Sequence, residues 1–242
     1  MPDTIERTTT LTFGTRSSAL ALYQAEFVAA RLRELLPGIG VDIRPMSSPG
    51  DRDLSTDLRE SPQDFFTRDL DQAVCAGDLD GAIHSAKDLP APLPEGIDWC
   101  WLPWRADPRD VWVLREGATL ADLPESPRLG ISSERRDAYC RGRFPKAVFA
   151  PLRGTIEQRL EQLDCGDFDA LIIAGAALVR LQLDHRISEW ISTDALRVPE
   201  GQGVLALTFR EGDPVLQKLR SLFVKAVRII GAGVGQAGYC TW

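Results

Sequence analysis

The sequence lacks the features that mark several common classes of protein. No apolar run in its 242 residues approaches the ~20 residues that a membrane-spanning helix needs. The opening residues, MPDTIERTTT, hold no apolar segment of the kind found in a secretory signal, so we expect a cytoplasmic protein. The five cysteines are scattered without a Cys-x-x-Cys pair, and there are two histidines. We therefore expect neither a disulfide framework nor a metal site.

The charge is acidic overall but unevenly distributed. A net charge of −7 argues against a general nucleic-acid-binding protein. Between residues 128 and 159, however, eight basic residues are accompanied by three acidic ones, and seven of the eight are arginine. Arginine binds carboxylate or phosphate through paired hydrogen bonds, so the cluster predicts a small anionic ligand. A solvated helix face with chance clustering is the alternative interpretation.

The order of apolar and turn residues predicts two α/β units of about 100 residues each. In the first, a helix that begins after Ser17 or Ser18 and a helix that ends at Gly77 alternate with strands at 11–13, 41–43 and 79–83. After a proline-rich stretch, strands are expected at 97–102, 111–114, 129–131, 148–150 and 168–173, with helices after Ser133 and Thr155. A late strand at 204–209 could join either sheet.

Polar and charged residues follow several of these strands. In an open α/β sheet, ligands bind beyond the carboxyl ends of the strands. The residues found there are Arg16, Asp51, His84, Lys87 and Asp88 in the first unit, and Ser132, Ser133, Arg135, Arg136 and Arg153 in the second. Two such edges facing each other would form a cleft for a polycarboxylate or a phosphate, with helix N-termini as further anion sites. Asp88 beside Lys87 is a candidate acid/base group, although a loop Asp is also common as a turn or cap residue.

At these residues the sequence resembles the porphobilinogen deaminase (hydroxymethylbilane synthase) family. The matching segments, in the family's order and spacing, are GTRSSALALYQ (14–24), SPGD (48–51), HSAKDLP (84–90), RADPRDVWV (105–113), GISSERR (130–136), PLRGTIEQRL (151–160), FDALIIAGAALVRLQL (168–183) and EGQGVLAL (200–207). The resemblance implies an α/β fold of two periplasmic-binding-protein-like (type II) domains with an interdomain cleft. Domain 1 would cover 9–103 plus 198–222, so that the late strand rejoins it, and domain 2 would cover 104–197.

The resemblance also implies a function. Members of this family are transferases of tetrapyrrole and heme biosynthesis that condense porphobilinogen into the linear tetrapyrrole hydroxymethylbilane, release ammonia, and carry a covalent dipyrromethane cofactor without a metal. Asp88 matches the catalytic Asp, which would assist loss of ammonia and stabilise positive charge on the substrate. The positions that match substrate or cofactor contacts are Arg16, Ser18, Lys87, Ser133, Arg135, Arg136, Arg153, Gly154, Arg159 and Arg180.

Three departures from the family pattern leave an alternative open. The lid segment, here LRESPQDFF (58–66), has no glycine, Arg59 near one lysine position and Gln63 at the other. The loop that carries the cofactor cysteine is not recognisable, and Cys240, the candidate attachment point, lies early and in a different context. The tail, 223–242, contains VRIIGAGVGQAGYCTW (227–242), which resembles the first strand and Gly-rich loop of the uroporphyrinogen-III methyltransferase family and predicts the start of a further fused domain. The alternative function is therefore a degenerate, inactive module that binds a pyrrole or tetrapyrrole for a fused or separate partner.

Overall fold

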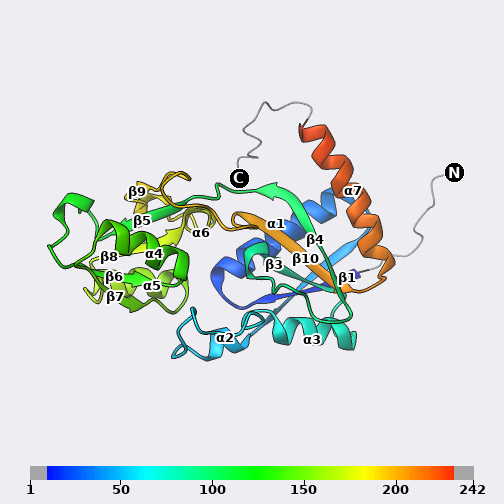
Figure 1. Cartoon of the computed structure of the whole chain (residues 1–242). Helices are drawn as coiled ribbons and strands as arrows, with labels where there is room; N and C mark the ends of the chain where they lie inside the picture. The colour runs from blue at the N-terminus through cyan, green and yellow to red at the C-terminus, as the bar shows by residue number, and fades with distance from the viewer. Residues whose placement is uncertain (1–9, 232–242) are drawn as a thin grey trace. The chain divides into compact units, whose positions relative to one another are not determined.

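The computed structural model describes residues 10–231, which form two compact units (Figure 1). Within the described range, unit 1 comprises residues 10–49, 63–104 and 204–231, and unit 2 comprises 50–62 and 105–203. Each unit is built on a sheet of five strands. The two sheets share one plan: three strands run parallel, and an antiparallel strand pairs with the third of them in chain order.

The sheet of unit 1 has the strand order β2-β1-β3-β10-β4. Its strands are β1 (Thr10–Arg16), β2 (Gly40–Met46), β3 (Gly81–Ser85), β4 (Ile97–Arg105) and β10 (Val204–Arg210). β1 pairs in parallel with both β2 and β3, and β10 is antiparallel to β3. The late strand therefore lies in the first sheet, as the resemblance implies.

Local sequence signals set the helices of unit 1, which are α1 (Ala19–Leu35), α3 (Arg68–Ala76), the 3₁₀ helix η1 (Ala86–Asp88) and α7 (Pro214–Gly231). Ser18 caps α1, since its side chain accepts a hydrogen bond from the backbone N–H of Ala21. Gly77 ends α3 with a φ of 86°, in the left-handed region that favours glycine. Both boundaries confirm the sequence prediction.

The prediction of a strand at the start of the tail is wrong. Residues 227–230 belong to α7, which runs from Pro214 to Gly231. No glycine or proline interrupts residues 215–230, and Leu219 and Phe223 are buried one helical turn apart, a spacing that favours a helix over a strand. The Gly-rich segment after Gly231, including Cys240, lies outside the described residues.

The sheet of unit 2 has the strand order β7-β6-β8-β5-β9. Its strands are β5 (Asp110–Leu114), β6 (Arg128–Ile131), β7 (Val148–Pro151), β8 (Ala170–Ala174) and β9 (Glu189–Trp190). β6 pairs in parallel with β7 and β8, whereas β5 is antiparallel to β8 and β9. Every residue of β8 is buried, which matches the continuous apolar run in its sequence.

A helix follows each parallel strand of unit 2: α4 (Glu134–Arg143) follows β6, α5 (Ile156–Asp164) follows β7 and α6 (Gly175–Arg180) follows β8. The unit also contains the 3₁₀ helices η2 (Leu120–Asp122) and η3 (Asp184–Arg186), and the short α2 (Pro49–Arg52) begins at the last residue before its segment 50–62. Ser133 caps α4, and Thr155 forms a capping box with Gln158 at the start of α5. The core of the unit centres on Trp112 of β5, whose ring lies 5.7 Å from that of Phe144.

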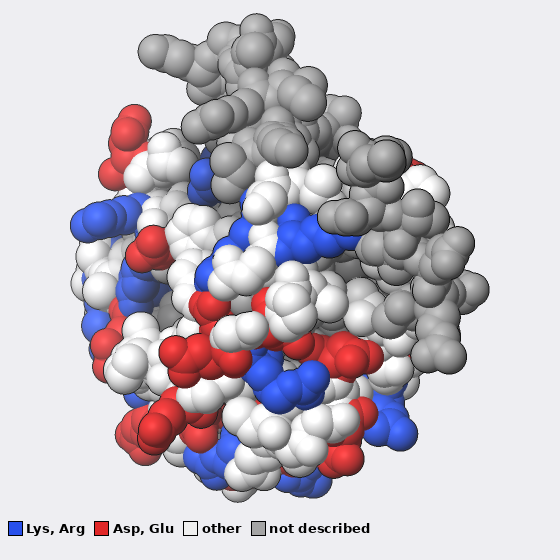
Figure 2. All heavy atoms as spheres, turned by 90° about the vertical axis from the view of Figure 1, so that its right-hand side faces the viewer, with Lys and Arg blue, Asp and Glu red and all other residues white. Residues whose placement is uncertain are grey.

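The surface carries charges of both signs. Acidic and basic side chains are interspersed on the face drawn in Figure 2. Among the described residues, no helix combines the length and the apolar character that crossing a membrane requires. At the carboxyl ends of its parallel strands, each sheet brings together residues that are distant in sequence.

Candidate active site

Asp88 and Lys87 lie at the carboxyl end of β3, in the single turn of η1. The Asp88 side chain is half-buried and Lys87 is exposed. β3 lies between β1 and β10, and its buried residues fix the position from which η1 begins. The result is a carboxylate on a rigid strand end beside a cation, which is the arrangement expected of an acid/base group.

His84, the other titratable group predicted at this strand end, is a core residue. It is buried in β3, and its Nε2 lies 3.0 Å from the Oγ1 of Thr208 on β10. Burial, together with the nearby Arg16 charge, lowers the pKa of His84 to about 4, so the ring is neutral at pH 7. His84 therefore ties β3 to β10, and the charged residues of this segment that reach the surface are Lys87 and Asp88.

Arg16 shares this edge of the sheet, because it is the last residue of β1 and β1 runs parallel to β3. Its guanidinium carbon lies 4.2 Å from the centre of the Phe66 ring. An aromatic face holds a guanidinium by cation–π attraction without using its N–H donors. Ser18 follows at the start of α1, so the edge of unit 1 offers Asp88, two cations and a helix N-terminus.

In unit 2, Arg135 and Arg136 occupy the first turn of α4 after the capping residue Ser133. Arg136 is 5% exposed, and its Nη2 lies 2.7 Å from Oδ1 of Asp110. Its Nη1 donates to the Oγ of Ser132 at 3.0 Å. Arg135 is more accessible, with 24% of its side chain exposed, and its Nη2 lies 2.5 Å from Oδ2 of Asp110.

Asp110 is the buried anchor of this arginine pair. Burial alone would raise its pKa, but the charges of Arg136 and Arg135 prevail and hold the pKa of Asp110 below its usual value. Gln202 adds a hydrogen bond of 3.1 Å from Nε2 to Oδ1 of Asp110. Sequence reasoning did not single out Asp110, although it ends the Asp-Pro-Arg-Asp series within the segment 105–113.

Arg153, Gly154 and Arg159 lie at the end of β7 and on the helix that follows it. Gly154 has a φ of 96°, and a Cβ there would lie 2.7 Å from the Gln158 side chain, so this position requires glycine. Arg159 donates from Nε to the Gly154 carbonyl at 2.9 Å. A pocket of about 480 Å³ opens beside them, lined in part by Leu54, Arg153, Gly154, Gln162 and Cys165.

Arg180, at the end of α6, is buried inside unit 2. Its Nη2 donates to the carbonyl of Gly203 at 2.8 Å. Gly203 has a φ of 82°, and a Cβ there would lie 2.5 Å from the carbonyl oxygen of Ala106. Arg180 therefore stabilises the segment that immediately precedes β10. Among the described residues, no group of three metal-ligating side chains is present.

The fold and the two sheet edges define the class of protein. The chain has the fold of periplasmic-binding-protein-like (type II) α/β domains. It is similar to the BenM effector binding domain solved with benzoate, with 12% identity, a TM-score of 0.53 and coverage of 97% of this chain and 98% of that one. It is also similar to a substrate binding domain of an amino acid ABC transporter from Streptococcus pneumoniae, with 15% identity, a TM-score of 0.58 and coverage of 93% and 94%.

The family follows from sequence. Residues 11–218 match the family described as porphobilinogen deaminase, dipyromethane cofactor binding domain, and the chain belongs to this family. A porphobilinogen deaminase of Deinococcus radiodurans is 42% identical over 208 residues, which cover 84% of this chain and 67% of that protein. One of Thiobacillus denitrificans is 42% identical over 205 residues, with the same coverage. The chain thus spans about two thirds of the length of these relatives.

Proposed function

We propose that this chain is a cytoplasmic transferase of the porphobilinogen deaminase type, which joins porphobilinogen units into hydroxymethylbilane and releases ammonia. Membership of the family supports this function. The observation that carries it is Asp88, a carboxylate held on a strand end next to Lys87 and on the same sheet edge as Arg16. The proposal includes the division into domain 1 (9–103 with 198–222) and domain 2 (104–197).

In this proposal Asp88 acts on the amine that leaves and on the charge that results. When the C–N bond of the substrate's ammonium group breaks, ammonia leaves with the bonding electron pair, and the Asp88 carboxylate assists this loss by stabilising the positive charge that remains on the pyrrole. Lys87 and Arg16 bind the carboxylates of porphobilinogen. In unit 2 the same role belongs to Arg135, Arg153 and Arg159, whose side chains are partly exposed, while the buried Arg136 and Arg180 position their neighbours.

The residues present fit a dipyrromethane cofactor, whose acetate and propionate groups need cations and N–H donors. The N-terminus of α4, with Ser133 at its cap and Arg135 in its first turn, supplies such a donor set, as does the N-terminus of α1 behind Ser18. When bound, the cofactor supplies the pyrrole to which the first substrate unit is joined. The proposal assigns no attachment point for the cofactor, since Cys240 departs in place and context from the family's cofactor cysteine and lies outside the described residues.

Replacement of Asp88 by Asn tests the proposal. We expect Asp88→Asn to lower the rate of ammonia release from porphobilinogen by about 10²- to 10⁴-fold, the typical contribution of a positioned acid/base group. Asp78→Asn, which changes an exposed Asp of the same unit, is the matched control and should keep full activity. Circular dichroism should show both variants folded. Wild-type turnover by Asp88→Asn would refute the assignment of Asp88.

One observation favours the second candidate function, a module that binds a tetrapyrrole without making it. Arg59, near the position of a lid lysine in the family, has its guanidinium engaged by Asp57 and Asp137 of this chain. Calorimetry with hydroxymethylbilane, run beside the ammonia assay, separates the two functions. Tight binding without ammonia release would favour the binding module, and ammonia release would exclude it. The intact mass of the denatured protein would show any covalently attached cofactor in either case.

A further inference from the structure

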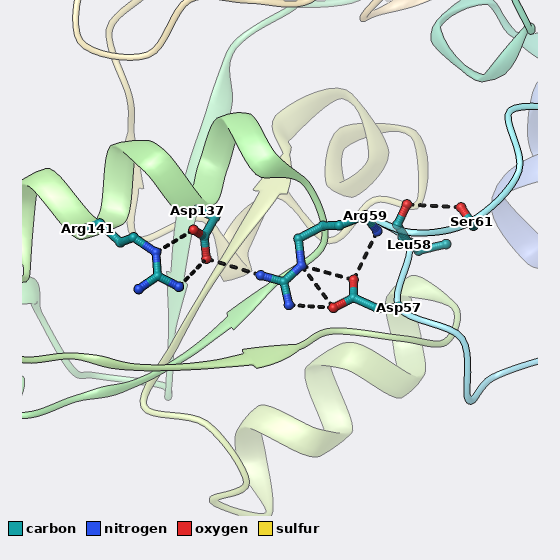
Figure 3. A network of polar contacts seen from close by, with 6 residues as sticks. All are labelled: Asp57, Leu58, Arg59, Ser61, Asp137 and Arg141. Carbon is teal, nitrogen blue, oxygen red and sulfur yellow. Dashed lines mark hydrogen bonds and ion pairs between the residues drawn. The ribbon is translucent and has the colours of Figure 1, made fainter.

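Residues 50–62, which we call the strap, carry an ionic network centred on Arg59 (Figure 3). Arg59 donates from Nε to both oxygens of Asp57, at 3.0 and 2.9 Å, and from Nη2 to Oδ2 of the same residue. Its Nη1 lies 3.2 Å from Oδ1 of Asp137, on α4. Asp137 also accepts from Nε of Arg141 at 2.5 Å. One guanidinium therefore joins a carboxylate of the strap to a carboxylate of α4.

The network is better shielded from water than an ordinary surface ion pair. The side chain of Arg59 is 24% exposed, and those of Asp57 and Asp137 are less exposed still. The hydrogen bond from Arg59 lowers the pKa of Asp57 although burial opposes it, so this carboxylate is ionised at neutral pH. Partly buried pairs are screened less by salt than exposed ones. The contact can thus hold the strap against α4.

The other end of the strap contacts Arg153, which we propose to bind a substrate carboxylate. Nη2 of Arg153 donates to the carbonyl of Gly50 at 3.1 Å and to the carbonyl of Asp53. The Asp53 carboxylate accepts hydrogen bonds from the backbone N–H groups of Ser55 and Thr56, at 2.8 and 3.0 Å, so the turn that presents these carbonyls is itself braced. The strap thus has two anchors on unit 2, one at α4 and one at Arg153.

We propose that Arg59 is a positioning residue for substrate binding: it fastens the strap to α4, and the strap holds the guanidinium of Arg153. The donors of a guanidinium lie in one plane in a fixed fork, so carbonyls that bind one Nη set the direction in which the other donors point. This role rests on the proposed function, since it assumes that Arg153 binds porphobilinogen. The competing interpretation is that Arg59 touches the substrate itself.

Hydrogen exchange of the strap tests the anchor without relying on activity. In Arg59→Gln and Asp137→Asn, we expect backbone amides of residues 50–62 to exchange about fivefold faster than in the wild type, which corresponds to the loss of the one partly buried ion pair that joins the strap to α4. Arg115→Gln is the matched control, because it removes an ion pair to Asp169 in the same unit from a side chain that is 51% exposed. Wild-type exchange in Arg59→Gln would overturn the proposal.

Kinetics with porphobilinogen then distinguish a positioning role of Arg59 from direct contact of Arg59 with the substrate. If Arg59 acts through the strap, both Arg59→Gln and Asp137→Asn should raise KM about fivefold with kcat within twofold, since a carboxylate on α4 would not itself attract the substrate. Arg59→Lys keeps the charge without the fork and should give intermediate exchange and KM. A rise in KM for Arg59→Gln with an unchanged or lower KM for Asp137→Asn would overturn positioning in favour of direct contact.

Two further outcomes, one in the turnover of the strap variants and one in that of the wild-type chain, also test the proposal. Faster turnover in the strap variants would overturn the proposal, because the strap would then obstruct the substrate. If the wild-type chain shows no turnover, the proposed function fails, and the Kd of porphobilinogen by calorimetry takes the place of KM. Equal Kd values in wild type and both variants would overturn positioning, whereas parallel weakening in the two variants would support it.

Discussion

The buried ion pairs of Asp110 allow a quantitative test of what holds the arginines of α4 in place. We consider Asp110→Asn, which removes the charge and keeps the shape of the side chain. In the wild type, Asp110 lies 2.7 Å from Nη2 of Arg136 and 2.5 Å from Nη2 of Arg135, and it accepts a hydrogen bond from Gln202 at 3.1 Å. The substitution leaves two guanidinium groups without their shared anion.

The expected loss of stability comes mainly from Arg136. Its side chain is almost fully buried, and removal of one partner of a buried ion pair costs ~3–5 kcal/mol because a charge is left uncompensated. Arg135 can turn toward water, so its share is at most ~1 kcal/mol. The Asn oxygen still accepts a hydrogen bond from Arg136 or Gln202, which places the total near the lower end, at about 3 kcal/mol.

Urea unfolding followed by circular dichroism at pH 7 measures this loss. Asp164→Asn, which removes a half-exposed partner of Arg186 in the same unit, is the control and should cost less than ~1 kcal/mol. Because the pKa of Asp110 is lowered in the folded state, its contribution is present above the unfolded pKa, near ~4, and is lost as pH falls through the folded value. A loss below ~1 kcal/mol, or a loss that does not shrink in acid, would refute the reasoning.

Two further predictions concern stability. Burial raises the pKa of Asp71 to about 6, so wild-type stability should fall as pH rises from ~4 to ~6, and Asp71→Asn should be more stable by ~2 kcal/mol at pH 7, with the difference vanishing below pH ~4. Thermal unfolding across pH checks this, and equal Tm values at pH 7 would contradict it. Ser133→Ala removes the side-chain oxygen that accepts the hydrogen bond from the backbone N–H of Arg136, and it should lower the free energy of unfolding, measured in urea, by ~1 kcal/mol. An unchanged midpoint of urea unfolding would show that the cap does not stabilise the protein.

Much of the fold could be predicted because its signals are local. The caps at Ser18 and Ser133 and the stop at Gly77 each depend on residues within one helical turn, and all three lie where the sequence indicates. The tail could not be predicted in the same way. A short apolar run such as 227–230 is compatible with a buried strand or with one face of a helix, and only the helical packing of α7 decides between them.

The site was only partly predictable from the sequence, because several of its contacts join residues that lie far apart along the chain. Asp88 and its cationic neighbours follow strands directly, so the topology of an α/β sheet indicates their position. The carboxylates that anchor the arginines do not follow this rule. Arg59 meets Asp137 across 78 positions, and Asp110 meets Gln202 across 92. No periodicity of the sequence encodes such pairs, because each is formed by elements that meet through tertiary packing.

The arginine cluster between residues 128 and 159 shows why a count of charges cannot assign roles. The members of the cluster differ in their exposure and in their partners, so neither interpretation, a ligand site or a solvated surface, describes all of them. Arg141 is exposed and paired with Asp137. Arg136 is buried, and its two Nη groups donate to Ser132 and Asp110. What a guanidinium can offer a ligand is the set of donors that the fold has left accessible. Arg135 is also paired, since its Nη2 lies beside Asp110 and its Nη1 donates to the carbonyl of Arg197 at 2.9 Å. Its side chain is nevertheless 24% exposed against 6% for Arg136, so Arg135 is the more accessible of two arginines that are adjacent in sequence and share one anchor.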